Sequence, residues 1–407
     1  MSQGRKDIFL FIVGLLGAFQ FRMVGTFYGV EIVAFLSYLF IPWRRYTSNP
    51  MMKKFIKMSF VWLLGSIIAD LANGIEMEPA MKGIFNIVFF ILQIPFVYWA
   101  LYDKVSRWIY FYTGYAISTI INFYTYRVDI INEGDFLVWQ FYAWVQLVVA
   151  IAAILYYRKH HFLAYLLAVG FGVYGLFNSS RNLFLILTLA TIILFFMDRM
   201  KGEDIATKIS SYQRKSFGLI LMLAIGAFAV SDSYEYLASN EILGEAAYNK
   251  YEMQKSSKIG LASGRGDFVL GVEFLVRNPI IGYGSFAEDK EGLNPHLIRK
   301  YGMDYFGNNS NTDYFDVVPC HSVLVGQWNW HGILAGIFWL YYLLLMYKSL
   351  RKGVFLLEPK MAGLAVFASI MMLWDIFFSP MGARPPFVFY FIFLILINTR
   401  YKQLFNQ

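Results

Sequence analysis

The sequence predicts an all-α membrane protein that crosses the bilayer about twelve times, because of its composition and its hydrophobic pattern. Of its 407 residues, 58% are hydrophobic and only 15% are charged, whereas a soluble domain carries roughly 25% charged residues. The apolar residues form long runs separated by charged clusters, and a helix needs roughly 20 residues to cross the hydrocarbon core. These observations exclude a soluble enzyme, a nucleic-acid-binding protein and an outer-membrane β-barrel.

The predicted spans are the apolar runs, taken in order along the chain. They lie at 7–21, 24–42, 55–72, 83–101, 107–125, 137–157, 161–178, 182–198, 216–232, 322–347, 361–378 and 385–398. The first run follows a basic N-terminus, as in a signal peptide. No small-residue cleavage site comes after it, so we expect a retained span.

The basic residues predict the orientation, because Lys and Arg accumulate on the cytoplasmic side. With the N-terminus inside, the cytoplasmic connections hold 22 of the 35 Lys and Arg residues, and the short outer connections hold five. The remaining eight lie in the long segment before span ten. We therefore expect both termini in the cytoplasm, and the net charge of +8 needs no nucleic-acid partner.

This topology divides the chain into spans one to nine (1–232), a large outer loop (233–321) and spans ten to twelve (322–407). Apolar residues recur at helical spacing over 267–276, which predicts a short helix at the membrane interface. The Asn278-Pro279 pair and a Gly-Tyr-Gly turn at 282–284 end that helix. The single cysteine excludes an internal disulfide.

Ionisable residues near membrane depth are costly, so four on the outer side are candidate site residues. Arg181 follows a serine pair in a tight turn between two spans; it either extends to lipid headgroups or binds phosphate oxygens in a cavity. Arg265 stands between two glycines at the start of the predicted helix, where a helix N-terminus favours anions. Its alternative is an ordinary ion pair with Asp267.

The other two candidates flank the last three spans. His321 lies where the outer loop re-enters the membrane; it either transfers a proton near neutral pH or donates to a backbone carbonyl as a structural residue. The adjacent Cys320 points about 100° away on a helix, so we expect no Cys–His catalytic pair. Arg384, in the connection before span twelve, is either a further phosphate contact or an interface anchor.

Weaker candidates lie elsewhere. Glu31 is the most deeply placed acid, which fits either a proton pathway or a buried ion pair. We expect His331 to have a structural role in helix packing, with its ring nitrogens hydrogen-bonded. Glu76 and Glu78, together with Asp70, have ligand types for a divalent ion, but two acids in an exposed connection do not make a metal site. No P-loop, Rossmann or HExxH motif is present.

Several short motifs, in this order around one outer loop, resemble the bacterial O-antigen polymerase and O-antigen ligase superfamily (the Wzy and WaaL proteins). They are Ser179-Ser180-Arg181, Gly264-Arg265-Gly266, Asn278-Pro279-Ile280-Ile281-Gly282-Tyr283-Gly284, His321-Ser322 and His331-Gly332-Ile333-Leu334-Ala335-Gly336. The family often has Asn where this chain has Ser322, and an aromatic residue after the loop arginine, a role that Phe268 can fill.

The resemblance implies an inverting, metal-independent glycosyltransferase of the GT-C membrane type that needs no cofactor. Family members transfer glycan from an undecaprenyl-diphosphate carrier at the periplasmic face of the bacterial inner membrane. Arg181 and Arg265 match the family's diphosphate-binding pair, and His321 matches the histidine that orients or deprotonates the acceptor hydroxyl. Preorganised arginines would stabilise the charge that develops on the leaving diphosphate. Arg384 as a further phosphate contact is a hypothesis from position alone.

Three functions stay open at this point. A polymerase would extend a lipid-linked repeat unit into O-antigen, capsule or exopolysaccharide, and an aromatic outer loop favours this function. A ligase would transfer the finished glycan to lipid A–core or to protein. A transporter of lipid-linked oligosaccharide would perform no chemistry. Besides the lipid bilayer and the lipid-linked donor, a chain-length-regulating membrane protein is a conceivable partner of a polymerase.

Overall fold

The computed structural model describes residues 3–23, 25–40, 49–101, 105–127, 133–177, 181–199, 234–258, 266–302, 317–352, 359–379 and 384–405. Its helices are α1 (Gln3–Leu15), α2 (Gly29–Ser37), α4 (Pro50–Ala72), α5 (Met77–Leu101), α6 (Val105–Asn122), α7 (Glu133–Tyr157), α8 (His161–Phe177), α9 (Arg181–Arg199), α11 (Glu245–Ser256), α12 (Gly266–Arg277), α13 (Leu293–Tyr301), α14 (Val323–Leu350), α15 (Pro359–Phe378) and α16 (Pro385–Phe405). A two-stranded antiparallel sheet pairs β1 (Gln20–Met23) with β2 (Gly25–Tyr28).

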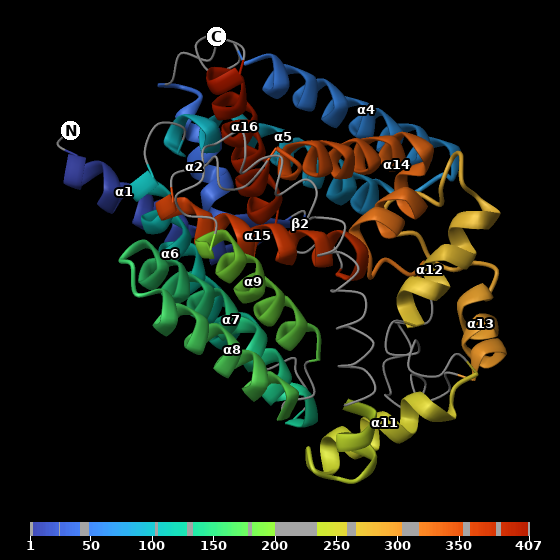
Figure 1. Ribbon diagram of the computed structural model, residues 1–407. Coiled ribbons are helices and arrows are strands. Elements are labelled where there is room, and N and C mark those ends of the chain that lie inside the picture. Colours follow the sequence, from blue (N-terminus) through green and yellow to red (C-terminus); the bar gives the residue numbers. More distant parts are fainter. Residues whose placement is uncertain are drawn as a thin grey trace.

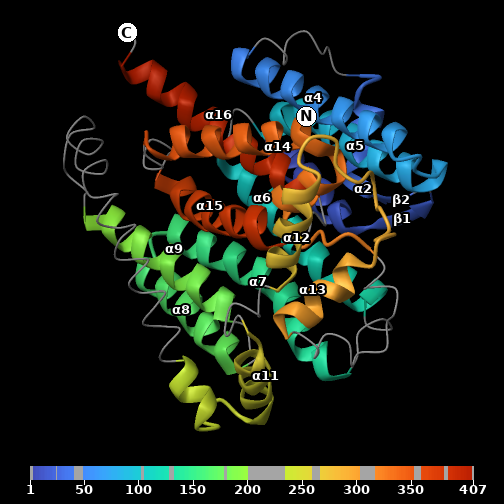
Figure 2. The ribbon, with the colours of Figure 1, turned by 90° about the vertical axis from the view of Figure 1, so that its right-hand side faces the viewer.

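The helices form two groups joined by α15 (Figure 1). Helices α6 to α9 stack side by side in one group, and α4, α5 and α14 pack together in the other. Helix α15 contacts α7 and α9 on one side and α14 and α16 on the other. Helices α11, α12 and α13 gather along one flank of the bundle (Figure 2). The segment 245–301 therefore supplies a separate layer of short helices.

Within the described residues, five helices are long and apolar enough to cross a membrane: α4, α5, α9, α14 and α15. The outward face of α4 carries a stripe of exposed apolar side chains, including Phe60 (54% exposed), Leu64 (52%) and Leu71 (78%). Such a stripe suits lipid rather than water. The all-α membrane class is thus supported, whereas the count of twelve spans stays a prediction, and the ninth predicted span (216–232) lies outside the described residues.

The prediction of two continuous spans at 7–21 and 24–42 is wrong in detail. Helix α1 ends at Leu15, and a 3₁₀ turn leads into the hairpin before α2 begins at Gly29. Phe21 pairs directly with Phe27 across the two strands, and aromatic cross-strand pairs stabilise strands over helix. Helix α1 still packs closely, since a Cβ on Gly14 would lie 2.1 Å from the Phe111 carbonyl oxygen of α6.

The predicted helix at 267–276 is confirmed as α12, which buries Leu270 and Phe274 and ends at Arg277. The Gly-Tyr-Gly turn after it is also confirmed: Gly282 and Gly284 have φ values of 80° and 94°. Only glycine adopts such values without strain.

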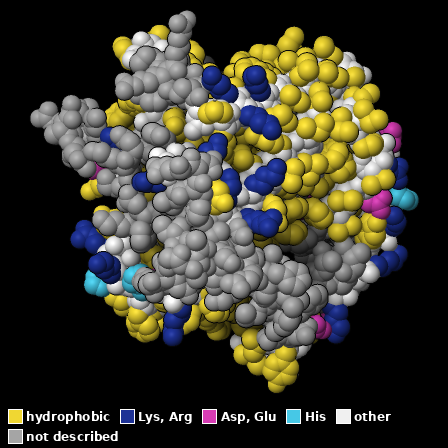
Figure 3. Space-filling model, turned by 45° about the horizontal axis from the view of Figure 1, so that its top comes forward, with side chains coloured by type: hydrophobic (Ala, Val, Ile, Leu, Met, Phe, Trp, Pro, Cys, Tyr) yellow, Lys and Arg dark blue, Asp and Glu magenta, His cyan; other side chains and the backbone are white. Residues whose placement is uncertain are grey.

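Basic side chains gather on one face beside a broad hydrophobic surface (Figure 3). Two cation–π contacts join basic residues to neighbouring helices. The Lys54 ammonium of α4 lies 5.3 Å from the centre of the Tyr341 ring of α14, and Lys352, just after α14, lies 5.0 Å from the Tyr401 ring of α16. The sequence predicts that all three helix ends lie on the cytoplasmic side, and this orientation stays a prediction.

Candidate functional site

The start of α12 and the residues just before α14 meet at a histidine–aspartate pair. His321 Nδ1 lies 3.6 Å from Asp267 Oδ2, although the two residues are 54 positions apart in the chain. The His321 side chain is 40% exposed and the Asp267 side chain 21%. A carboxylate beside Nδ1 favours the tautomer with its proton on that nitrogen, which puts the basic lone pair on Nε2. This arrangement suits a general base at a partly exposed site.

Local backbone contacts hold His321 in place. The Ser322 side chain caps α14 by accepting from the Val325 amide at 3.2 Å, and it donates to the Ile376 carbonyl of α15 at 3.2 Å. Serine at this position thus supplies a helix N-cap. A Cβ on Gly326 would lie 2.8 Å from the Cys320 carbonyl oxygen. The residues on both sides of His321 are therefore fixed against α14 and α15.

Cys320 takes no part in this pair. Burial, together with the neighbouring Asp267 carboxylate, raises the pKa of the Cys320 thiol to about 11. The thiol stays protonated near neutral pH, so it is a poor nucleophile. The sequence argument against a Cys–His pair assumed helical geometry, whereas both residues lie before α14; the protonated thiol is what argues against the pair.

For the two arginines assigned to the diphosphate, the structure describes only the backbone of Arg181. Helix α9 begins at Arg181, whose side chain lies outside the described part of the chain. Arg265 also lies outside it, directly before the first residue of α12. The alternative partner considered for Arg265 was Asp267; that pair stays a prediction too, and the contact described for Asp267 is with His321. The sequence had not anticipated this contact. Phosphate binding by Arg181 and Arg265 stays a prediction.

Arg384 is buried rather than exposed at an interface. Its side chain is 6% exposed and forms a two-pronged pair with Glu31, Nε donating to Oε1 and Nη2 to Oε2 at 2.7 Å. It also donates to the Asn86 side chain of α5 and lies 5.2 Å from the centre of the Tyr28 ring. Of the two hypotheses for Glu31, the geometry favours the buried pair. Because that pair occupies the guanidinium, we leave Arg384 out of the proposed diphosphate site.

The motif segments at 278–284 and 331–336 pack directly on each other. Gly332 interrupts α14 with φ 68° and ψ −166°. The carbonyls of Asn329 and Trp330 accept from the amides of Tyr283 (2.7 Å) and Gly284 (2.9 Å). A broken helix in a membrane must have its backbone groups satisfied by protein. The loop segment supplies those partners here.

His331 forms a buried hydrogen-bonded chain beneath this contact. The Trp62 indole donates to His331 Nδ1 at 3.0 Å, so a neutral ring carries its proton on Nε2, which lies 3.2 Å from Ser285 Oγ. Ser285 donates to Asp70 at 3.0 Å. His331 is 1% exposed, and its basic lone pair is already used. The expected packing role is therefore confirmed, and Asp70 binds this chain rather than grouping with Glu76 and Glu78.

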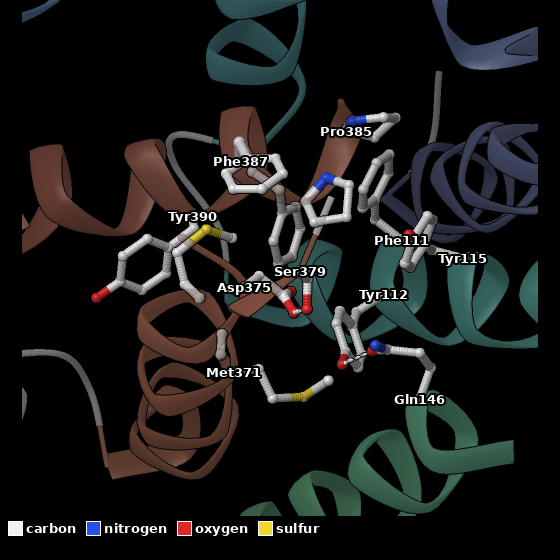
Figure 4. A pocket seen from close by; sticks show the side chains of 14 residues that line it. Phe111, Tyr112, Tyr115, Gln146, Met371, Asp375, Ser379, Pro385, Phe387 and Tyr390 are labelled. Carbon is white, nitrogen blue, oxygen red and sulfur yellow. Dashed lines mark hydrogen bonds between the residues drawn. The ribbon is translucent and has the colours of Figure 1, made fainter. Parts of the chain in front are cut away.

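A cavity of about 190 Å³ lies between α6, α7, α15 and α16, and the sequence had not singled it out (Figure 4). Asp375 and Ser379, at the end of α15, stand between Tyr112 and Tyr390. Ser379 donates to Asp375 at 2.9 Å, and Tyr112 donates to Gln146. An acid within a predicted span was the available signal, but only the fold shows that it lines a cavity.

Comparison with known proteins gives no further assignment. No protein-family model matches the chain, and a search of curated proteins finds no similar sequence. The structure, the motif order and the chemistry of the site therefore carry the functional argument.

Proposed function

We propose that the protein is a glycosyltransferase that polymerises lipid-linked repeat units into a polysaccharide at the outer face of the bacterial inner membrane. The acceptor is a second lipid-linked repeat unit, and the donor is glycan on undecaprenyl diphosphate. The single observation that carries the proposal is the contact of His321 with Asp267, two residues after Arg265. It puts a partly exposed base next to the segment that bears the proposed phosphate ligand.

In the proposed reaction, an acceptor hydroxyl attacks the anomeric carbon of the donor sugar. A C–O bond forms to the acceptor while the C–O bond to the diphosphate breaks on the opposite face, so the configuration inverts. His321 takes the hydroxyl proton, and undecaprenyl diphosphate leaves with the bonding electron pair. The Asp267 carboxylate stabilises the imidazolium that forms. Arg265 and Arg181 would stabilise the negative charge on the leaving diphosphate.

The ligase and the transporter differ from the polymerase in what happens after the donor binds. A ligase uses the same donor site with lipid A–core as acceptor. A transporter moves the lipid-linked glycan without breaking the bond to diphosphate. A partly exposed His–Asp pair outside the candidate spans favours chemistry over transport, because the proton relays of transporters lie within the membrane.

Reconstitution of the full-length protein into vesicles tests the proposal. Undecaprenyl-diphosphate-linked repeat units are the sole substrate, and products are resolved on a gel. We expect a ladder of longer lipid-linked glycans, lost in His321→Ala and severely reduced in Arg265→Lys, because a point charge cannot replace a planar five-donor fork. Arg277→Lys, at the exposed end of α12, is the matched control and should keep the ladder.

The other outcomes contradict the proposal in distinct ways. Transfer only after lipid A–core is added would establish a ligase. Movement of intact lipid-linked glycan across the membrane, with no transfer, would establish a transporter. Full activity of Arg265→Lys would remove the role assigned to that arginine.

A further inference from the structure

We infer that the cavity lined by Asp375 is a sugar-binding site that holds a sugar of the acceptor glycan next to the one that reacts. The inference deepens the proposed function and rests on it. The residues that carry it are Asp375, Ser379, Gln146, Tyr112 and the ring of Phe111, all of which line the cavity.

The first argument is the chemistry of the lining. Aromatic side chains from α6 and α16 make up much of the wall, and the polar groups are few: a carboxylate, a hydroxyl, an amide and phenols. Ligand sites combine an apolar wall with a small number of convergent polar groups. A sugar ring matches this pattern, because its C–H faces pack on aromatic rings and its hydroxyls donate to a carboxylate.

The second argument is the state of Asp375. A carboxylate accepts up to about four hydrogen bonds, and the one described for Asp375 comes from Ser379, the residue just after the end of α15. A carboxylate at membrane depth is costly unless it has donors. Sugar hydroxyls entering the cavity would supply them.

The third argument is position. Asp375 directly precedes Ile376, whose carbonyl accepts from Ser322, the residue after His321. On the following turn, Phe378 packs against Phe268 of α12, with ring centres 5.7 Å apart. The last turns of α15 therefore separate the His321–Asp267 pair from the cavity. A glycan with one sugar in the cavity would pass the end of α15 and bring the adjoining sugar to the proposed base.

Kinetics with a variable acceptor test the inference. The full-length protein in lipid nanodiscs receives the lipid-linked repeat unit as donor. The acceptor is the same repeat unit released from its lipid by mild acid and labelled. Asp375→Asn should raise the acceptor KM by about tenfold or more, because one charge-assisted hydrogen bond is lost. The donor KM should stay within about twofold of wild type.

A second variant acts by filling the space. Ala368→Leu adds bulk to the cavity wall without removing a polar group and should raise the acceptor KM in the same way. Glu78→Gln is the matched carboxylate-to-amide control, since that side chain is 70% exposed at the start of α5. It should leave both KM values unchanged. Thermal unfolding of each variant shows whether the fold is retained.

The outcomes separate the two claims. If wild type makes no product, the proposed function fails, whatever the variants do. If wild type transfers and folded Asp375→Asn and Ala368→Leu keep the wild-type acceptor KM, the sugar site is wrong while the transferase stands. A rise in donor KM with an unchanged acceptor KM would assign the cavity to the donor and likewise overturn the inference.

Discussion

Two carboxylates lie inside the helical bundle and have opposite surroundings. Glu31 is 0% exposed and accepts from the Tyr28 amide, the Gln93 side chain and two nitrogens of Arg384. Asp375 accepts from Ser379 and lines a cavity. A carboxylate whose oxygens are fully engaged by protein donors holds helices together. A carboxylate that faces a cavity is available to a ligand. This difference assigns Glu31 to the stability of the fold and Asp375 to the proposed ligand site.

The largest effect on stability should come from Glu31→Gln. The substitution leaves the Arg384 guanidinium buried without its counter-charge, and breaking a buried pair from one side costs about 3–5 kcal/mol. We expect a much lower unfolding midpoint in detergent. Exposed Glu78→Gln is the control and should change the free energy of unfolding by less than about 0.5 kcal/mol. Equal midpoints for Glu31→Gln and wild type would contradict the framework role.

Arg384→Lys should have an intermediate effect. Lysine keeps the charge but cannot form the two parallel bonds to Glu31 and also reach Asn86, so we expect a loss of about 1–3 kcal/mol. The same unfolding assay measures it. Arg277→Lys, on the exposed end of α12, is the matched control. A variant as stable as wild type would show that charge alone, rather than the two-pronged geometry, holds α16 to α2.

Asp375→Asn should have a smaller effect on the free energy of unfolding, below about 1 kcal/mol. The amide has the shape of the carboxylate and keeps an oxygen that can accept from Ser379. A loss as large as that of Glu31→Gln would remove the distinction between the two carboxylates and make Asp375 part of the framework.

The smallest expected effect concerns Cys320, whose thiol lies next to the proposed site and stays protonated near neutral pH. Its raised pKa, about 11, means that the folded protein prefers the protonated thiol. The associated stability is complete below the ordinary thiol pKa of roughly 8.5. It is lost as the pH rises through 11. Alkylation of the folded protein should be slow at neutral pH and accelerate toward pH 11, whereas fast alkylation at neutral pH would contradict the burial.

Many of the helices could be predicted, because an apolar run long enough to cross a membrane almost always forms a helix. The predicted span 55–72 ends with α4 at Ala72, and 83–101 ends with α5 at Leu101. The helix at 267–276 was also found within a residue or two at each end. The hairpin before Gly29 was missed because it lies within an apolar region that reads as two membrane spans. The pairing of Phe21 with Phe27 becomes visible only in the structure.

The site was less predictable, since its contacts join distant parts of the chain. Arg384 pairs with Glu31, which is 353 positions away in the sequence. No sequence pattern predicts a contact over that separation. Asp267 contacts His321 across 54 positions, and no sequence pattern pointed to that contact. The sequence analysis did not single out Asp375, because the cavity that it lines exists only once four helices have packed.

The central claim is that this protein breaks the bond between a glycan and a lipid diphosphate and remakes it to an acceptor. The most direct test measures both products of one round of transfer by mass spectrometry of the reconstituted protein. We predict one undecaprenyl diphosphate released for each lipid-linked dimer of repeat units formed, and neither product with His321→Ala. Diphosphate release without a dimer, or transport of the intact donor with no release, would contradict the account.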